Sequence, residues 1–271
     1  MPAVPSPSEP RERAVLDQVV EVVRAAGALT LRWFRSQSLD IDHKDDGTPV
    51  TPADRAAERF LREELGRLFP DDGVIGEEEP DTTGGSGCTW VLDPIDGTKA
   101  FTHGVPLYST LVARYDELGC ALGVIDLPAL GETVFAGRGL GCHHRRADGV
   151  VVEARVSGRS DLSGGCVCTS GLGAWSRARL DALLATGTLV RTWGDGYGFA
   201  LVATGRIEAM VDPAVALWDL GPLPVIVTEA GGRFTDDEGR PGPTTLEPGC
   251  TRAAVATNGL VHDAVLAVLG A

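Results

Sequence analysis

The pattern of apolar and polar positions predicts an α+β region in the first part of the chain. Apolar residues recur at a helical period over residues 9–36, and a second helix is expected over 52–68. Thr51 suits the N-cap of this second helix, because Pro52 follows it at the first helical position. The turn-rich segment 44–50 between the helices predicts a hairpin or loop. Successive antiparallel strands are predicted by short β-type runs at residues 107–115, 120–127, 132–137 and 151–156.

After residue 156 the pattern changes to alternating strands and helices. Strands are predicted near residues 166–170, 188–193, 207–212, 232–235 and 253–257. Helices are predicted at residues 174–186, 197–205, 218–231 and 259–269. We therefore expect an α+β half over 1–156 and an α/β half over 157–271, packed as stacked layers of helices and sheets.

Composition and charge exclude several classes of partner. The net charge of −14 argues against nucleic acid and anionic membranes, which bind basic surfaces. No run approaches the ~20 apolar residues that span a membrane, and the N-terminal segment lacks the apolar core of a signal peptide. The six cysteines form no C-x-x-C pair. We therefore expect a reduced, soluble, cytoplasmic protein, in which a phosphorylated substrate would need bound cations to reverse the local charge.

The most informative segment is an apolar run that leads directly into Asp93 and Asp96. Mg²⁺ prefers oxygen ligands, and these two carboxylates together with the carbonyl of Ile95 would supply three. Gly97 and Thr98 then open a predicted helix, whose free N–H groups and dipole favour an anion such as phosphate. The segment therefore predicts a metal ion and a phosphate held side by side.

Two other segments strengthen this interpretation. A lone pair of carboxylates is more often structural than functional, since Asp is common in turns, and Pro94 is expected to break the strand here. However, the apolar strand that ends at Gly76 is followed by three glutamates, and Asp219 stands at the head of a helical pattern. Three separated segments thus place carboxylates at the ends of predicted elements, as expected when a distant chain assembles one pocket.

Four motifs occur in a characteristic order along the chain: Val50-Thr51-Pro52-Ala53-Asp54, Gly76-Glu77-Glu78, Trp90-Val91-Leu92-Asp93-Pro94-Ile95-Asp96-Gly97-Thr98, and Trp218-Asp219 followed by Glu229-Ala230-Gly231-Gly232. Over roughly residues 40–260 the chain thereby resembles the inositol monophosphatase superfamily of metal-dependent phosphatases. The resemblance implies a layered αβαβα sandwich of the sugar-phosphatase type, two or three Mg²⁺ ions, a small phosphorylated metabolite as substrate, and a homodimer.

The resemblance also implies roles for individual residues. The metal ligands would be the side chains of Glu77, Asp93, Asp96 and Asp219 and the carbonyl of Ile95. Most of these belong to the N-terminal half, whereas Asp219 and the substrate-side residues belong to the C-terminal half. Asp54 and Thr98 would polarise the attacking water, with Glu77 as a further catalytic residue. The backbone N–H groups of Gly97 and Thr98 would bind the phosphate.

Finer features resemble the histidinol-phosphate phosphatase branch, notably Asp96-Gly97-Thr98-Lys99-Ala100-Phe101, Arg191-Thr192-Trp193-Gly194-Asp195-Gly196-Tyr197 and Met210-Val211-Asp212-Pro213. Asp195 and Asp212 would pair with the ammonium and imidazole groups of histidinol phosphate, and Arg191 is a third substrate candidate. A helix N-cap is the alternative for Asp195. Glu78 and Lys44 are further possible site residues, with solvated surface side chains as the alternative. Gly196 departs from the usual pattern of the branch.

The expected function is therefore that of a Mg²⁺-dependent phosphomonoesterase that hydrolyses L-histidinol phosphate in histidine biosynthesis. Inositol monophosphatase and 3′-phosphoadenosine 5′-phosphate phosphatase activities are the alternatives within the superfamily. A non-catalytic sensor of phosphorylated ligands is an alternative from another class. The presence of both Asp54 and Thr98 argues against a sensor, which does not need a pair that activates a nucleophile.

Overall fold

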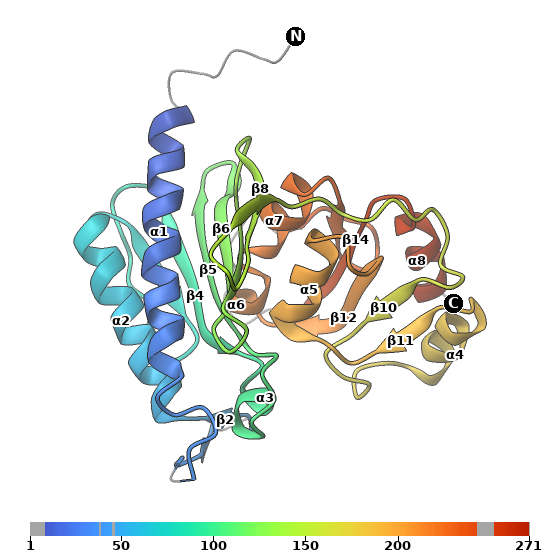
Figure 1. The fold of residues 1–271 in the computed structure, drawn as a ribbon, viewed down its shortest axis with the longest axis horizontal. Helices are drawn as coiled ribbons and strands as arrows, with labels where there is room; N and C mark the ends of the chain where they lie inside the picture. The colour runs from blue at the N-terminus through green and yellow to red at the C-terminus, as the bar shows by residue number, and fades with distance from the viewer. Residues whose placement is uncertain (1–8, 38, 45–46, 243–251, 271) are drawn as a thin grey trace.

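The computed structural model describes residues 9–37, 39–44, 47–242 and 252–270. Two large sheets alternate with three layers of helices, as Figure 1 shows. This arrangement confirms the layered αβαβα fold that the sequence predicts. None of the helices in the described ranges is both long and apolar enough to cross a membrane.

The first sheet has seven strands, of which only the first pair is parallel. In spatial order they are β3 (Gly73–Gly76), β4 (Thr89–Asp96), β5 (Ser109–Asp116), β6 (Gly119–Leu127), β7 (Glu132–Gly137), β8 (Gly141–Arg145) and β9 (Val151–Glu153). The predicted antiparallel run is therefore confirmed, with β8 as an additional strand. Burial alternates along β8, whose two buried positions hold Cys142 and His144, so His144 takes a place that an apolar residue would mark in the sequence.

The second sheet has five strands and is built from the later part of the chain. In spatial order they are β11 (Leu189–Arg191), β10 (Cys166–Cys168), β12 (Ala209–Val215), β14 (Arg252–Thr257) and β13 (Arg233–Thr235). A separate two-stranded hairpin, β1 (Asp42–His43) with β2 (Pro49–Val50), occupies the turn-rich segment before the second helix. Both features agree with the predicted pattern.

The helices cover both faces of the first sheet and the outer face of the second (Figure 1). The outer layer beside the first sheet consists of α1 (Glu9–Thr30) and α2 (Pro52–Leu68). The middle layer consists of α5 (Asp195–Ala203), α6 (Leu217–Leu220) and α7 (Leu223–Glu229). The outer layer beyond the second sheet consists of α4 (Arg177–Ala185) and α8 (His262–Leu269). The short helix α3 (Thr98–Thr102) follows β4.

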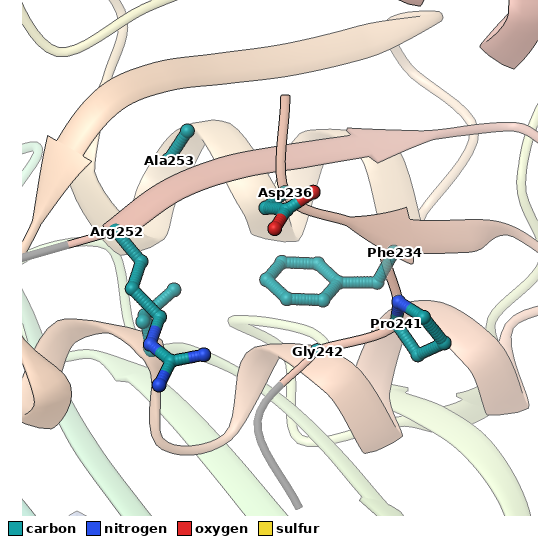
Figure 2. Close-up of a pocket in the computed structure, with 7 residues that line it drawn as sticks. Phe234, Asp236, Pro241, Gly242, Arg252 and Ala253 are labelled. Carbon is teal, nitrogen blue, oxygen red and sulfur yellow. The ribbon is translucent and has the colours of Figure 1, made fainter. Parts of the chain in front are cut away.

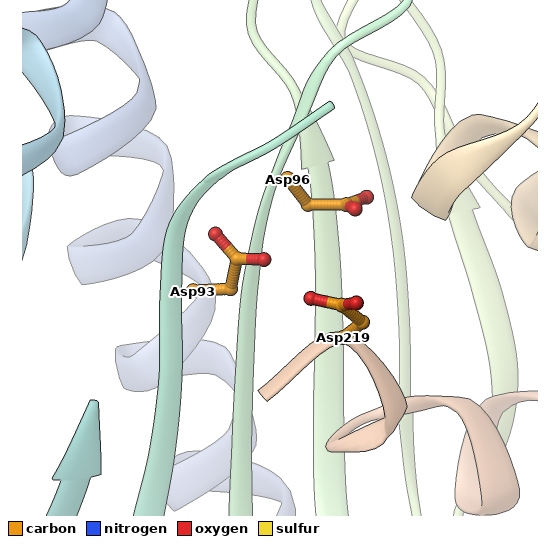
Figure 3. Close-up of side chains that lie close together, drawn as sticks. All are labelled: Asp93, Asp96 and Asp219. Carbon is orange, nitrogen blue, oxygen red and sulfur yellow. The ribbon is translucent and has the colours of Figure 1, made fainter. Parts of the chain in front are cut away.

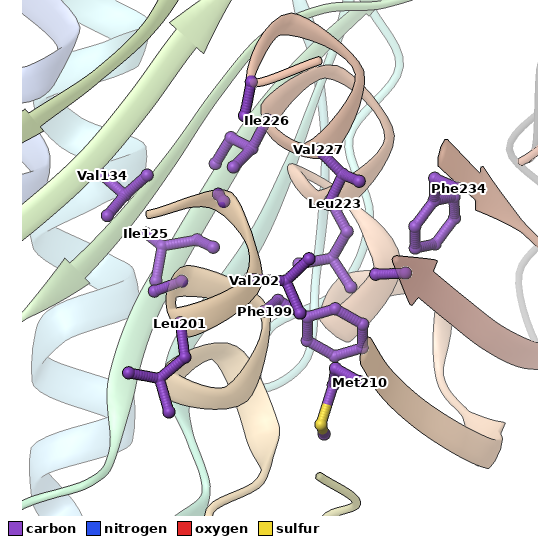
Figure 4. Packing of buried hydrophobic residues seen from close by; sticks show 14 of the residues in the cluster. Ile125, Val134, Phe199, Leu201, Val202, Met210, Leu223, Ile226, Val227 and Phe234 are labelled. Carbon is purple, nitrogen blue, oxygen red and sulfur yellow. The ribbon is translucent and has the colours of Figure 1, made fainter. Parts of the chain in front are cut away.

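The largest apolar core joins the two sheets through this middle layer. Figure 4 shows Ile125 and Val134 of the first sheet on one side of α5 and α7, and Met210 and Phe234 of the second sheet on the other. Most of these side chains are fully buried, so removal of their apolar surface from water stabilises the packing of the layers. A separate cluster packs α6 directly on β4, with Leu217 and Trp218 beside Val91, and so sets α6 next to this strand.

Three predicted element boundaries are wrong for identifiable reasons. The first helix ends at Thr30 rather than at residue 36. At this end the Thr30 hydroxyl donates to the carbonyl of Gly27 (2.6 Å) and contacts the Tyr108 hydroxyl (2.9 Å). The predicted helix 218–231 is two short helices, because Pro222 lacks an N–H and interrupts the helical hydrogen bonds. Finally, β4 continues through Pro94 instead of ending there.

A buried acid on β6 predicts a pH-dependent stability. Asp126 is 4% exposed, and burial raises its pKa to about 7 although Thr133 donates a hydrogen bond of 2.8 Å to it. Because the pKa of Asp126 is higher in the folded state than the unfolded value of about 3.9, its bound proton stabilises the fold at low pH. This stabilisation is lost as the pH rises through about 7. We expect Asp126→Asn to raise the Tm by at least roughly 3 °C near pH 8 and to change it less near pH 5. Calorimetry at both pH values tests this, and an equal shift at both would contradict it.

Candidate active site

Three carboxylates from distant parts of the chain meet at the boundary between the first sheet and the middle layer. Asp93 and Asp96 stand at the end of β4, and Asp219 stands in the first turn of α6. One oxygen atom of each lies within 4.8 Å of the others, and Figure 3 shows the three side chains pointing toward one another. The carboxylates are therefore close enough to share a metal ion.

The end of β4 is irregular, and this irregularity helps to place its two carboxylates. The pairing with β5 shifts register between Asp93, opposite Leu111, and Asp96, opposite Ser109. Within the irregular segment the N–H of Ile95 donates to Asp93 Oδ1 (3.1 Å). A register shift of this kind changes the direction of side chains along a strand, so residues three apart can face the same space.

Two residues that were not predicted as site residues hold Asp96 in place. The Ser109 hydroxyl donates to Asp96 Oδ2 at 2.7 Å, and the N–H of Gly196 donates to the same atom at 2.5 Å. A Cβ atom at position 196 would lie 2.3 Å from Ser109 Oγ and 2.8 Å from Asp96 Oδ2. Glycine at this position therefore allows the first turn of α5 to approach the carboxylate. The unusual Gly196 in the motif was the signal for this contact.

The electrostatics of the cluster favour a bound cation. Burial raises the pKa values of Asp93 and Asp96 well above the usual range. The charges of Glu77, Asp96 and Asp219 add to the effect on Asp93, and burial raises the pKa of Asp219 to about 7. Like charges in a low-dielectric space disfavour ionisation unless a cation neutralises them.

Glu77 and Glu78 lie beside this cluster and contact a lysine. Lys44 Nζ is 2.7 Å from Glu77 Oε1 and 2.7 Å from Glu78 Oε1. Burial lowers the pKa of Lys44, but the charges and hydrogen bonds of both glutamates outweigh burial and raise that pKa above its usual range. The Lys44 ammonium therefore neutralises part of the acidic charge at the site.

Asp54 has one oxygen engaged and one free. The backbone N–H and the hydroxyl of Thr51 donate to Asp54 Oδ2 at 2.8 and 2.6 Å, which forms the N-terminal cap of α2. Asp54 Oδ1 is buried and has no hydrogen-bond partner among the described residues. Burial raises the pKa of Asp54 to about 7. A buried oxygen without a partner is costly, so Oδ1 is suited to bind a metal ion, a water molecule or a hydroxyl.

These residues fit Mg²⁺ by their chemistry. The three clustered side chains offer only carboxylate oxygen, with no nitrogen or sulfur ligand, and carboxylates are the ligands that Mg²⁺ selects. Of the remaining predicted ligands, Glu77 contributes charge to the cluster, and the carbonyl of Ile95 accepts a hydrogen bond from the Thr98 hydroxyl at 3.0 Å. Ligation of a metal ion by these two groups, as by the three clustered carboxylates, stays a prediction.

The predicted phosphate turn adopts a conformation that requires glycine. Gly97 has φ of 82°, in the left-handed region, and it precedes the first turn of α3. Asp195 Oδ2 would lie 2.9 Å from a Cβ atom at position 97. Asp195 itself has φ of 55°, and its N–H donates to the Ser170 hydroxyl at 2.7 Å. The structure thus places the Asp195 carboxylate against the turn that would bind phosphate.

The other two predicted substrate residues differ in their surroundings. Asp212 is buried and accepts hydrogen bonds from the Thr169 hydroxyl (3.0 Å) and from the N–H and hydroxyl of Ser170 (2.7 and 2.5 Å). It therefore orients the serine that contacts Asp195. Arg191 is exposed at the end of β11, with its guanidinium 5.9 Å from the centre of the Trp193 ring. Direct contact of Asp212 or Arg191 with substrate stays a prediction.

A small pocket elsewhere in the molecule does not belong to this site. It lies beside β13 and β14 and is lined by Leu220, Phe234, Asp236, Pro241, Gly242, Arg252 and Ala253 (Figure 2). Among the described residues that line it, none is a candidate site residue. The carboxylate cluster at the end of β4 therefore remains the place where the predicted chemistry gathers.

The raised pKa values predict that metal binding and proton release are linked. Without metal, buried carboxylates that hold protons stabilise the fold at low pH, and this contribution disappears as pH rises through about 7. Mg²⁺ must displace these protons, so we expect it to raise the Tm more near pH 8 than near pH 6. Thermal melts with Mg²⁺ or with EDTA at both pH values test this expectation. Equal Tm increases at the two pH values would contradict it.

Comparisons with known proteins agree with this geometry. A sequence model of the inositol monophosphatase family matches residues 12–269. A histidinol-phosphatase of Mycobacterium tuberculosis is 40% identical over 250 residues, which are 91% of this chain and 94% of that protein. A histidinol-phosphatase of Chlorobaculum parvum is 43% identical, over 83% of this chain and 86% of that protein. The structure of a Thermotoga maritima IMPase superimposes with a TM-score of 0.82 at 28% identity, covering 95% of this chain and 97% of that one.

Proposed function

Because this chain belongs to the inositol monophosphatase family, we propose that it hydrolyses L-histidinol phosphate to L-histidinol and phosphate with the aid of Mg²⁺. Its class is that of a phosphoric monoester hydrolase. The observation that carries the proposal is the convergence of Asp93, Asp96 and Asp219, which gives the chain a site for a hard cation. The names of the histidinol-phosphatase relatives support the choice of substrate.

The metal site would be formed by side chains of the cluster. Asp93, Asp96 and Asp219 would hold Mg²⁺, with Glu77 and the carbonyl of Ile95 as further ligands. Bound Mg²⁺ supplies charge neutralisation for a phosphate ester and lowers the pKa of coordinated water. We propose two or three Mg²⁺ ions, because the side chains of Glu77, Asp93, Asp96 and Asp219 and the carbonyl of Ile95 offer more ligands than one Mg²⁺ ion that keeps several waters would take.

The chain's own groups would move the proton and hold the phosphate. The Thr98 hydroxyl stands at the start of α3, and Asp54 Oδ1 is free to accept a hydrogen bond. We propose that Thr98 and Asp54 act as a pair, in which Thr98 would orient the attacking water and Asp54 would receive its proton, since a hydroxyl alone is a poor base. The N–H groups of Gly97 and Thr98 bind the phosphate oxygens at the turn.

The substrate preference follows from the position of acidic groups near that turn. Asp195 lies against Gly97, so a cation attached close to the ester would meet a carboxylate. Histidinol phosphate carries such an ammonium group, whereas an inositol ring presents only hydroxyl groups. Asp212 supports the arrangement through Ser170, and Arg191 remains a candidate at the outer edge.

The remaining expectations concern the context of the enzyme. We propose that the protein acts in histidine biosynthesis in the cytoplasm and forms a homodimer, with halves that divide near residue 156. Neither nucleic acid nor membrane is proposed as a partner, because the net charge is −14. Sedimentation equilibrium of the full chain would test the dimer.

Phosphate release from a small panel of esters tests the proposed function. The panel holds L-histidinol phosphate, inositol 1-phosphate and 3′-phosphoadenosine 5′-phosphate, each assayed with Mg²⁺ and with EDTA. We expect the highest kcat/KM on L-histidinol phosphate and no turnover in EDTA. Equal rates on histidinol phosphate and inositol 1-phosphate would contradict the specificity, and turnover of none of the esters would favour a sensor.

The variant Asp195→Asn is the matched probe of specificity in this panel. It removes the negative charge but keeps a side chain of the same size. We expect kcat/KM to fall on the order of tenfold for histidinol phosphate, as for the loss of one charge-assisted contact, with a smaller change for inositol 1-phosphate. An equal fall for both esters would show that Asp195 does not recognise the ammonium group.

A further inference from the structure

A fully buried glutamate lies one helical turn after Asp54. Glu58 of α2 is 0% exposed, so its carboxylate needs hydrogen-bond partners to offset the loss of water. Arg62 Nε donates to Glu58 Oε1 at 2.8 Å. The backbone N–H of Glu78 donates to Oε2 at 2.8 Å, and that of Glu79 donates to Oε1 at 3.1 Å. The carboxylate thus joins α2 to the turn that follows β3.

Arg62 completes this connection from the same helix. Its Nη2 donates to the carbonyl of Glu79 at 2.9 Å, while its Nε contacts Glu58. The turn is therefore bound through two N–H groups and one carbonyl. We call the set formed by Glu58, Arg62 and the backbone of Glu78 and Glu79 the α2 clamp.

The end of β3 is shaped to accept the α2 clamp. A Cβ atom at position 76 would lie 2.2 Å from Glu58 Oε1 and 2.7 Å from Arg62 Nη2. Backbone and side chains cannot approach so closely if residue 76 carries a side chain, so Gly76 is required here. The glycine of the Gly-Glu-Glu motif therefore has a steric purpose that is separate from the chemistry of the glutamates.

The clamped turn carries Glu77, whose charge acts on Asp93 and Asp219. Asp54 stands four residues before Glu58, so both lie on the same side of α2. One helix thus presents Asp54 directly and holds the turn of Glu77 through Glu58.

We propose that Glu58 is a positioning residue, which fixes the turn from Gly76 to Glu79 on α2 so that Glu77 faces the carboxylate cluster at a set place relative to Asp54. The role of Glu77 toward a metal ion rests on the proposed function, whereas the clamp itself rests on the contacts described above. Glu58 does not touch the reacting groups. It acts through the backbone of Glu78 and Glu79.

Amide hydrogen exchange in the metal-free protein tests the clamp directly. Glu58→Gln keeps the size of the side chain but removes the charge that two N–H groups and Arg62 share. We expect exchange at the amides of Glu78 and Glu79 to accelerate by roughly tenfold, which corresponds to the loss of a charge-assisted hydrogen bond. The control is Glu63→Gln, an exposed position on the same helix, at which neither amide should change.

Mg²⁺ binding measured by calorimetry without substrate provides the second readout. Residues that orient metal ligands typically affect affinity by about 10–100-fold, so we expect Glu58→Gln to weaken Mg²⁺ binding within this range and Glu63→Gln to leave it unchanged. A lower Tm with unchanged exchange at Glu78 and Glu79 and unchanged Mg²⁺ affinity would overturn the proposal, because it would mean a purely structural role.

A milder variant keeps the proposal testable if Glu58→Gln does not fold. Arg62→Lys retains the positive charge but cannot contact both Glu58 and the Glu79 carbonyl in the same way. Faster exchange at Glu79 is expected, and unchanged exchange would overturn the clamp. Neither readout uses a phosphate ester. Failure of the wild-type protein to bind Mg²⁺ would therefore reject the proposed function, while the exchange rates would still decide the clamp.

Discussion

Asp93→Asn is expected to lower kcat by about 10³-fold or more while the protein stays folded. The substitution removes a charged oxygen from the cluster with Asp96 and Asp219. The hydrogen bond that Asp93 Oδ1 accepts from the N–H of Ile95 can persist, because asparagine keeps a carbonyl oxygen in that place. Since Asp93 is 1% exposed among like charges, the metal-free variant should melt at the same temperature as the wild type or higher. Steady-state kinetics and thermal melts in EDTA measure the two effects.

The control for this experiment is Asp161→Asn, an exposed aspartate in a loop of the second half. It changes the net charge by the same amount, so kcat and Tm should stay at their wild-type values. Near-normal turnover of Asp93→Asn would mean that the carboxylate cluster is not the catalytic centre. A large loss of stability would instead mean that the carboxylate supports the fold.

Thr98→Ala is expected to lower kcat on the order of 10²–10⁴-fold with little change in Mg²⁺ affinity. The hydroxyl contacts the carbonyl of Ile95 at 3.0 Å, and its proposed task is to orient water together with Asp54. Removal of the hydroxyl leaves the three clustered carboxylates in place, so metal binding should persist. Rate measurements combined with Mg²⁺ titration by calorimetry separate the two quantities.

Two further variants test whether Thr98 and Asp54 act together. Thr98→Ser keeps the hydroxyl and should recover most of the turnover. The double variant Asp54→Asn with Thr98→Ala should be only slightly slower than the slower single variant, because groups that act as a unit are not additive. A Thr98→Ala protein with weak Mg²⁺ binding and normal kcat at saturating Mg²⁺ would reject the proposed role.

The sequence predicted the layered fold because most elements carry a clear local pattern. The cap of α2 at Thr51 and the short β-type runs of β5 to β7 are local signals, and the structure confirms both. The β8 strand was missed because one of its two buried positions holds a polar residue, His144, which contacts Glu132 at 2.7 Å. The break at Pro222 was not predicted, because the helical period on either side of the proline concealed it.

The candidate site was likewise predicted only in part. The clustering of Asp93, Asp96 and Asp219 was predicted, because carboxylates at element ends were signals within each segment. Ser109 and Glu58 were not, since their contacts depend on which elements pack together, and a serine or glutamate carries no local mark of such a contact. Pro94 was interpreted as the end of a strand, yet the register shift accommodates it within β4.

The order of the three clustered carboxylates along the chain matters during synthesis on the ribosome. Asp93 and Asp96 leave the ribosome with β4, long before Asp219 arrives with α6. Because chains fold from their N-terminal part first, the early sheet emerges with an incomplete cluster. On the proposed metal site, a translation product that stops before α6 would lack a ligand and should not act on cellular phosphate esters, so activity would begin only when most of the chain has been made.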